Sequence, residues 1–115
     1  MAVNIYDDIN RLEASFRKTP EFAAVQRTIE SVKQDPEALT IFRNFRKVQM
    51  SLQEKQMRGE QISGEELEYA QKTAQLAQQN PKIASMLQAE MNLSRIIEDI
   101  NKTLMKPVEA LYSGM

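Results

Sequence analysis

Cysteine, histidine and tryptophan are all absent from the 115-residue chain. Without cysteine there is no disulfide framework and no thiolate metal site. Without histidine there can be no Ser-His-Asp triad, no Cys-His pair and no Glu-x-x-His motif of the di-iron bundles. We therefore expect no catalytic residue, no bound cofactor and no metal site.

Glycine and proline are scarce, with three and four residues, which predicts few turns and long elements. The isolated glycines, Gly59, Gly64 and Gly114, form no phosphate-binding loop. No apolar run is long enough to span a bilayer. The first residues lack the basic stretch and apolar core of a secretory signal, so a cytoplasmic protein without membrane contact is expected.

Three prolines each follow a polar residue that can cap a helix: Thr19-Pro20, Asp35-Pro36 and Asn80-Pro81. These junctions predict helix starts and argue against strands. Gly59 suits a left-handed helix end, and Ser63 with Glu66 suits a capping box at the next start. Five helices are predicted. The first covers residues 4–18, the second starts at Pro20 and carries an apolar stripe to Val32, and the others cover residues 36–58, 64–79 and 81–106.

The fold class is therefore all-α. The third and fourth helices should form a central antiparallel hairpin, because their connection is short. The hairpin should pack on the long last helix within one domain, 1–115. Small residues of the fourth helix are expected against the phenylalanines of the third; they are Leu67, Ala70, Ala74 and Ala77.

Apolar residues of the last helix recur at heptad spacing, interrupted once by Glu90. The members of this seam are Ile83, Met86, Leu93, Ile97, Ile100 and Leu104. Glu90 is either a buried metal ligand or partner-specifying charge, or a packed stem whose carboxylate reaches water or a cation. The second interpretation is favoured, since polar seam residues more often set register. Pro107 should kink or end the helix.

The end of the seam predicts a homo-oligomer, most simply a dimer. A helix of residues 81–106 is roughly 39 Å long, longer than the roughly 34 Å diameter of a compact chain of this size. Soluble monomers rarely expose a contiguous apolar patch. The candidate interface contains Ile97, Ile100 and Leu104, with the first helix as a further candidate.

A basic patch on the third helix contains Arg43, Arg46 and Lys47, with Lys55 and Arg58 further along the helix. It could contact nucleic-acid phosphates. However, acids follow at Glu60 and Glu66, no aromatic residue interleaves with the cations on the exposed side, and the net charge is −1. Charge pairing across the hairpin is therefore favoured over a weak nucleic-acid-binding module.

The chain resembles the YlbF/YmcA family of bacterial helical proteins, specifically its YheA-like branch. The residues that carry the resemblance are Asn44-Phe45-Arg46, Gln49, Leu52-Gln53, Lys55-Gln56, Gly59-Glu60, Ile62, Met105-Lys106-Pro107, Glu109 and Leu111-Tyr112. The resemblance implies an all-helical cytoplasmic protein without a catalytic signature. Better-known members are regulatory partners in competence, sporulation and biofilm formation, in a complex that influences RNA processing and is associated with iron–sulfur clusters. This chain cannot ligate such a cluster through thiolates, because it has no cysteine. The expected function is non-catalytic, through self-association and an unknown protein partner.

Overall fold

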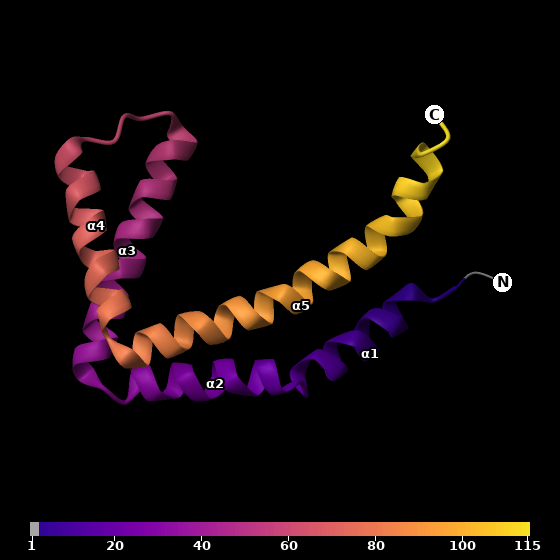
Figure 1. Ribbon diagram of the computed structural model, residues 1–115, viewed down its shortest axis with the longest axis horizontal. Coiled ribbons are helices and arrows are strands. Elements are labelled where there is room, and N and C mark those ends of the chain that lie inside the picture. The colour runs from indigo at the N-terminus through magenta and orange to yellow at the C-terminus, as the bar shows by residue number, and fades with distance from the viewer. Residues whose placement is uncertain (1–2) are drawn as a thin grey trace. The chain divides into compact units, whose positions relative to one another are not determined.

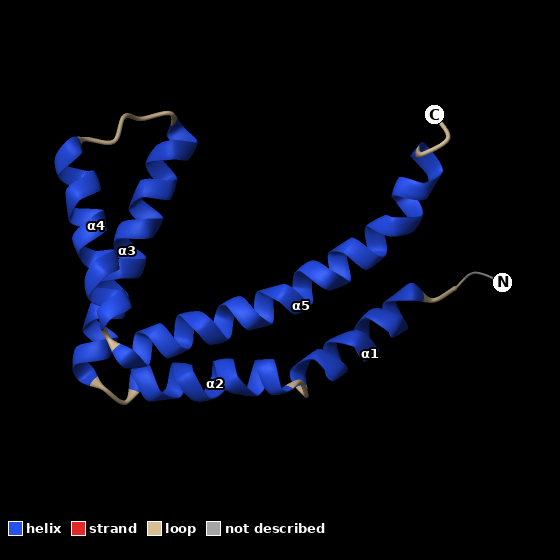
Figure 2. Ribbon diagram, in the orientation of Figure 1, coloured by secondary structure: helices blue, strands red, loops and turns tan. Residues whose placement is uncertain are grey.

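Helices make up all of the regular structure in residues 3–115, the part of the chain that the computed structural model describes (Figure 2). The helices are α1 (Ile5–Arg17), α2 (Pro20–Lys33), α3 (Pro36–Arg58), α4 (Gly64–Gln79) and α5 (Pro81–Tyr112) (Figure 1). The all-α prediction is confirmed. Met1 and Ala2, part of the segment inspected for a secretory signal, lie outside the described residues.

The chain forms two compact units. Residues 1–26 and 88–115 make up the first unit, and residues 27–87 make up the second. The first unit holds α1, the start of α2 and most of α5; the second holds the α3–α4 hairpin between the end of α2 and the start of α5. The assignment of the chain to one domain stays a prediction.

Each predicted polar-proline junction caps a helix. At all three junctions, an oxygen of the polar side chain accepts a hydrogen bond from the backbone N–H of the residue three positions later. These bonds join Phe22 N to Thr19 Oγ1 (3.1 Å), Ala38 N to Asp35 Oδ1 (3.2 Å) and Ile83 N to Asn80 Oδ1 (3.2 Å). Because proline occupies the first helical position, its missing N–H leaves no bond unmade there. Local sequence thus determines where α2, α3 and α5 begin.

The hairpin turn follows from Gly59, whose φ of 74° is left-handed, as predicted. The Gly59 N–H donates to the Gln56 carbonyl at 3.2 Å, and the Glu60 N–H donates to the Lys55 carbonyl at 2.9 Å. This pattern satisfies two carbonyls at the end of α3. Ser63 Oγ accepts the Glu66 N–H at 3.1 Å, but the Glu66 side chain pairs with Lys55. The first half of the expected capping box is therefore confirmed, and the Glu66 carboxylate also binds the Lys55 ammonium.

Gly59→Ala should lower the free energy of unfolding by about 1–2 kcal/mol, because a Cβ disfavours left-handed backbone. The cost should be purely conformational, since an added Cβ would meet no atom within 4 Å. Gly64→Ala is the matched control: it has the same open space and no positive φ, so it should be neutral or stabilising. Urea denaturation followed by circular dichroism measures both. Equal stabilities of the two variants would contradict the left-handed cap.

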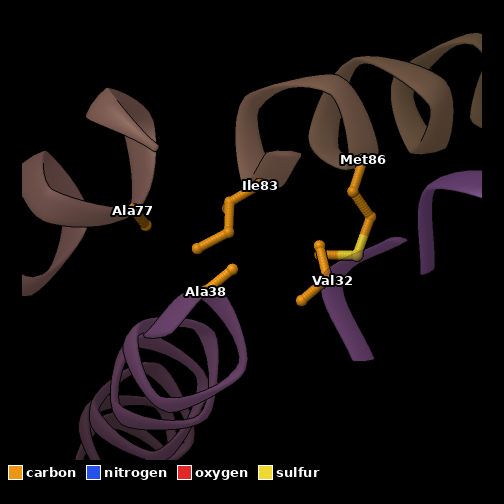
Figure 3. Packing of buried hydrophobic residues seen from close by; sticks show 5 residues of the cluster. All are labelled: Val32, Ala38, Ala77, Ile83 and Met86. Atoms are coloured by element: carbon orange, nitrogen blue, oxygen red, sulfur yellow. The ribbon is translucent and has the colours of Figure 1, made fainter. Parts of the chain in front are cut away.

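The core of the second unit lies where α2, α3, α4 and α5 contribute one or two side chains each. Val32, Ala38, Ala77, Ile83 and Met86 are buried there. Figure 3 shows Ile83 directed between Ala38 and Ala77, and Met86 beside Val32. Partly buried side chains pack around this cluster: Ile29, Ile41, Phe42, Phe45 and Leu87. The predicted packing of the hairpin on the long helix is confirmed at the first turns of α5.

The inner face of α4 differs from the prediction. Thr73 and Ala77 are buried, whereas Leu67 is exposed. Thr73 is tolerated inside because its hydroxyl donates to the Ala70 carbonyl at 2.9 Å, which leaves no unpaired polar atom. Ala77 and the phenylalanines of α3 do belong to one cluster, so only the rotation of the expected face was wrong.

Helix α5 continues past Pro107 to Tyr112, so of the two predicted outcomes, a kink or an end, the end is excluded. At about 1.5 Å per residue its 32 residues span roughly 48 Å. Pro107 removes one N–H, and the carbonyl that loses it, that of Thr103, belongs to an exposed residue and can bind water.

Glu90 is only partly buried, and Ala89 is the buried residue after Ile83 and Met86 along α5. Glu90 forms no ion pair with any residue from 3 to 115. This favours the interpretation in which its stem packs while its carboxylate reaches water.

Candidate interaction surfaces

The C-terminal part of α5 carries an apolar stripe of Ile97, Ile100, Leu104, Val108 and Leu111, here called the α5 stripe. Its members are three or four positions apart, which places them on one side of the helix. The exposed fraction is 46% at Ile97, 61% at Leu104 and 79% at Leu111. Every residue from 101 to 115 is exposed. The chain itself therefore leaves this stripe largely uncovered.

All three candidate interface residues lie on the α5 stripe. Ile97 and Leu104 are exposed, whereas Ile100 is partly buried. Because α5 does not end at Pro107, the stripe extends about two helical turns beyond Leu104, its last member within the predicted helix. Their role in an interface stays a prediction.

Helix α1 carries a second apolar face, the α1 stripe, made of Ile5, Ile9, Leu12 and Phe16. The first three are exposed, and α1 has no buried residue. Phe16 contacts Phe22 of α2 edge-on, with ring centroids 5.6 Å apart. The contact anchors only the end of α1, so most of the α1 stripe is open as well.

The basic patch lies on the side of α3 that faces away from the core cluster. Arg43, Arg46 and Lys47 are all exposed, whereas Phe42 and Phe45 pack against the core. None of the three cations forms an ion pair with a described residue. The predicted pairing across the hairpin is found for Lys55 with Glu66 but is wrong for these three residues. Helical spacing was the signal that could have shown this, since Arg43 lies roughly 160° around α3 from Phe45.

Two hollows flank α3. One, of about 390 Å³, lies between α3 and α4 and is lined by Asn44, Lys47, Val48, Ser51, Leu52, Lys55, Glu66 and Tyr69. The other, of about 420 Å³, lies on the basic patch and is lined by Arg43, Arg46, Lys47, Met50, Ser51 and Glu54. In the first, Glu66 neutralises Lys55. In the second, Glu54 pairs with Arg58 at 3.7 Å, and the three cations remain unpaired.

Two carboxylates have a lowered pKa, and both belong to the second unit. The backbone N–H of Ala38 and the ammonium of Lys82, 3.1 Å away, hold the pKa of Asp35 below its ordinary value. The ammonium of Lys55 does the same for the pKa of Glu66. Asp35 therefore both caps α3 and ties its start to the start of α5.

Asp35→Asn should lower the free energy of unfolding near neutral pH and make little difference in strong acid. Asparagine caps a helix as well as aspartate does, so the change removes mainly the charge. Because the pKa of Asp35 is lower in the folded chain, its stabilisation is complete above the unfolded value of about 3.9 and is lost as the pH falls through the folded value.

Urea titrations of wild type and Asp35→Asn between pH 7 and pH 2 measure this difference. Lys82→Gln removes the positive charge of the same ion pair, so at neutral pH it should lower the free energy of unfolding as Asp35→Asn does. A wild-type advantage that stays constant down to the lowest pH would contradict the assignment.

The described residues contain no cluster of three or more histidine, cysteine, aspartate or glutamate side chains that could hold a metal ion. Within residues 3–115, no helix is both long enough and apolar enough to cross a membrane. The acids that do occur serve as caps or ion-pair partners, or lie exposed or partly buried on single helices.

Residues 5–109 match the family model described as control of competence regulator ComK, YlbF/YmcA. The chain belongs to this family. It is 60% identical over 113 residues to a UPF0342 protein of Lysinibacillus sphaericus, covering 98% of each chain. It is 44% identical over 115 residues to the UPF0342 protein YheA of Bacillus subtilis, covering 100% of this chain and 98% of YheA. The predicted resemblance to the YlbF/YmcA family and its YheA-like branch is confirmed.

Solved structures share the fold. A DUF964 protein from Bacillus stearothermophilus aligns with a TM-score of 0.89 at 37% identity, over 96% of this chain and 97% of that one. RicA of B. subtilis, crystallised in complex with RicF, aligns with a TM-score of 0.70 at 17% identity, over 98% of this chain and 100% of that one. None of these relatives carries the name of an enzyme.

Proposed function

We propose that this YlbF/YmcA-family protein is a non-catalytic helical protein of the cytoplasm that forms a homodimer and regulates through protein partners. The observation that carries the proposal is the α5 stripe, whose last residues are exposed over the final turns of a helix. A surface of this kind is the usual mark of a protein interface.

A second copy is the simplest cover for the α5 stripe. In a twofold dimer the α5 stripe of each copy covers the α5 stripe of the other, so neither stripe stays exposed to water. Fully burying one aliphatic side chain contributes about 1.5–3 kcal/mol. With roughly half of each side chain still exposed in the single chain, two copies of the five-residue stripe contribute on the order of 10 kcal/mol before the cost of association. The α1 stripe adds area to the same unit.

Action through partners is supported by the description of the family and by the structure of a protein with the same fold. The family description concerns the control of a competence regulator. RicA, a protein of the same fold, was crystallised with a different protein, RicF. A non-catalytic role is supported by the lack of histidine and cysteine and by carboxylates that do not converge.

Sedimentation equilibrium or light scattering at tens of micromolar tests self-association. The expected mass is twice the 13.2 kDa of the chain. A mass of one chain at that concentration would overturn the dimer.

Cysteine labelling places the interface, because the native chain has no thiol of its own. Leu104→Cys should react slowly with a maleimide at concentrations where the dimer forms and faster on dilution. Ala110→Cys lies roughly 120° around α5 from position 104 and is also exposed, so its rate should not depend on concentration. A dimer in which both thiols react alike would place the interface elsewhere.

A further inference from the structure

The outer face of α3 carries cations and methionines together. Arg43, Arg46 and Lys47 are followed on the same side of the helix by Met50 and Met57. The opposite side packs against the core through Phe45. From Arg43 to Met57 this face runs about 21 Å, or nearly four helical turns. We call these five residues the α3 outer face.

The charge on this face is not satisfied within the chain. Lys55, Arg58 and Lys82 each have a carboxylate partner, but Arg43, Arg46 and Lys47 have none in residues 3–115. The chain as a whole carries a net charge of −1, so the three cations are a local excess rather than a general basic surface. Such an excess selects an anionic partner by charge.

The methionines make the same face apolar in part. Met50 is 53% exposed and Met57 is 83% exposed. Methionine is unbranched and polarizable, so it adapts its shape to a bound helix and occurs often in protein-binding grooves. The hollow of about 420 Å³ beside Met50 gives a side chain from a partner a place to enter.

We propose that the α3 outer face docks an acidic amphipathic helix of a partner protein. The apolar side of that helix would lie over Met50 and Met57, and its carboxylates would meet Arg43, Arg46 and Lys47. This proposal rests on the proposed action through protein partners, and it adds the chemistry of the partner and the place where it binds.

A nucleic acid fits this face less well. The aromatic residues of α3, Phe42 and Phe45, pack against the core, so no ring on this face can stack on a base. Exposed methionines contribute apolar contacts that a phosphate backbone does not use.

The test places a photo-crosslinking amino acid at Met50 in the full chain, expressed in the native host cell. A second probe at Gln71, an exposed residue of α4, is the positional control. The Met50 probe should give adducts with one other protein, and mass spectrometry should map them to an acidic segment with helical apolar spacing. The Gln71 probe should not give these adducts.

Charge reversal then tests the cations. Arg43→Glu with Arg46→Glu should reduce the Met50 adducts at least tenfold. Lys72→Glu with Lys102→Glu makes the same change in net charge at exposed sites elsewhere and should leave them unchanged. The mapped segment, made as a labelled peptide, should bind wild type at least tenfold more tightly than the Arg43→Glu, Arg46→Glu variant and more weakly as salt rises.

Several outcomes would overturn the proposal. They are adducts with RNA that disappear on nuclease treatment, adducts only with a second copy of this chain, a mapped segment that is neutral or basic, and no adduct above the Gln71 level. Failure here is separable from failure of the dimer. Both charge-reversed variants keep the α5 stripe, so both should still form the proposed dimer. The mass of each variant tests the dimer, and its adducts separately test the docking of a partner helix.

Discussion

Leu104→Asp should convert the dimer into folded monomers. Leu104 is 61% exposed and sits in the middle of the α5 stripe, so the change puts a carboxylate on each side of a twofold contact without opening a cavity inside the chain. Two carboxylates entering an apolar interface lose hydration and repel each other. Dimerisation should weaken at least about 100-fold, which corresponds to about 2.7 kcal/mol.

Sedimentation equilibrium across a concentration series measures the loss, and circular dichroism checks that the helices remain. Ala110→Asp adds the same charge on another side of α5 and should dimerise like wild type. Ile100→Asp is the harsher companion: because Ile100 is partly buried, this change should yield monomer or unfold the chain. A dimer that survives both Leu104→Asp and Ile100→Asp would rule out the α5 stripe as the interface.

Local chemistry determined most of the fold. The starts of α2, α3 and α5 follow from Thr19, Asp35 and Asn80, whose side chains accept nearby backbone N–H groups whatever the rest of the chain does. Gly59 ends α3 for an equally local reason, since its φ of 74° suits a residue without a Cβ. Features that depend on one residue and its immediate neighbours were therefore predictable.

At Pro107 the local rule allowed a kink or an end, and the end did not occur. Proline inside a helix removes one hydrogen bond and its ring crowds the carbonyl four residues earlier, which together cost about 3 kcal/mol or more. At Pro107 the freed carbonyl belongs to an exposed residue, Thr103, and the residues that follow continue the apolar spacing to Leu111. The helix therefore continues, and Val108 and Leu111 extend the α5 stripe.

The rotation of a helix about its own axis was harder to predict than the residues at which the helix begins and ends. Leu67 and Thr73 both fit an inward face of α4 by spacing, and only the hydrogen bond from Thr73 to the Ala70 carbonyl explains why the threonine is inside. For α3 the information was present: the apolar positions around Phe45 place Arg43 on the opposite side of the helix. Charge pairing was predicted from proximity along the chain, but it depends on direction around the helix.

The second large effect is expected in the core of the second unit. Ile83→Ala should lower the free energy of unfolding by about 2–5 kcal/mol, the usual range for emptying a fully buried aliphatic site. The exposed fraction of Ile83 is 0%, and its neighbours in Figure 3, Ala38 and Ala77, are too short to fill the space that it would leave. A domain of this size is stable by about 5–15 kcal/mol, so the loss is a large share of the total.

Urea denaturation at one fixed protein concentration measures this loss, because dimerisation also contributes to the apparent stability. Leu76→Ala, at an exposed position of α4, is the matched control and should cost much less than Ile83→Ala. Ile83→Val removes a single methylene and should cost about 0.5–1.5 kcal/mol. An Ile83→Ala variant as stable as Leu76→Ala would mean that the start of α5 does not pack against the hairpin. A graded loss from valine to alanine would show that this packing holds the second unit together.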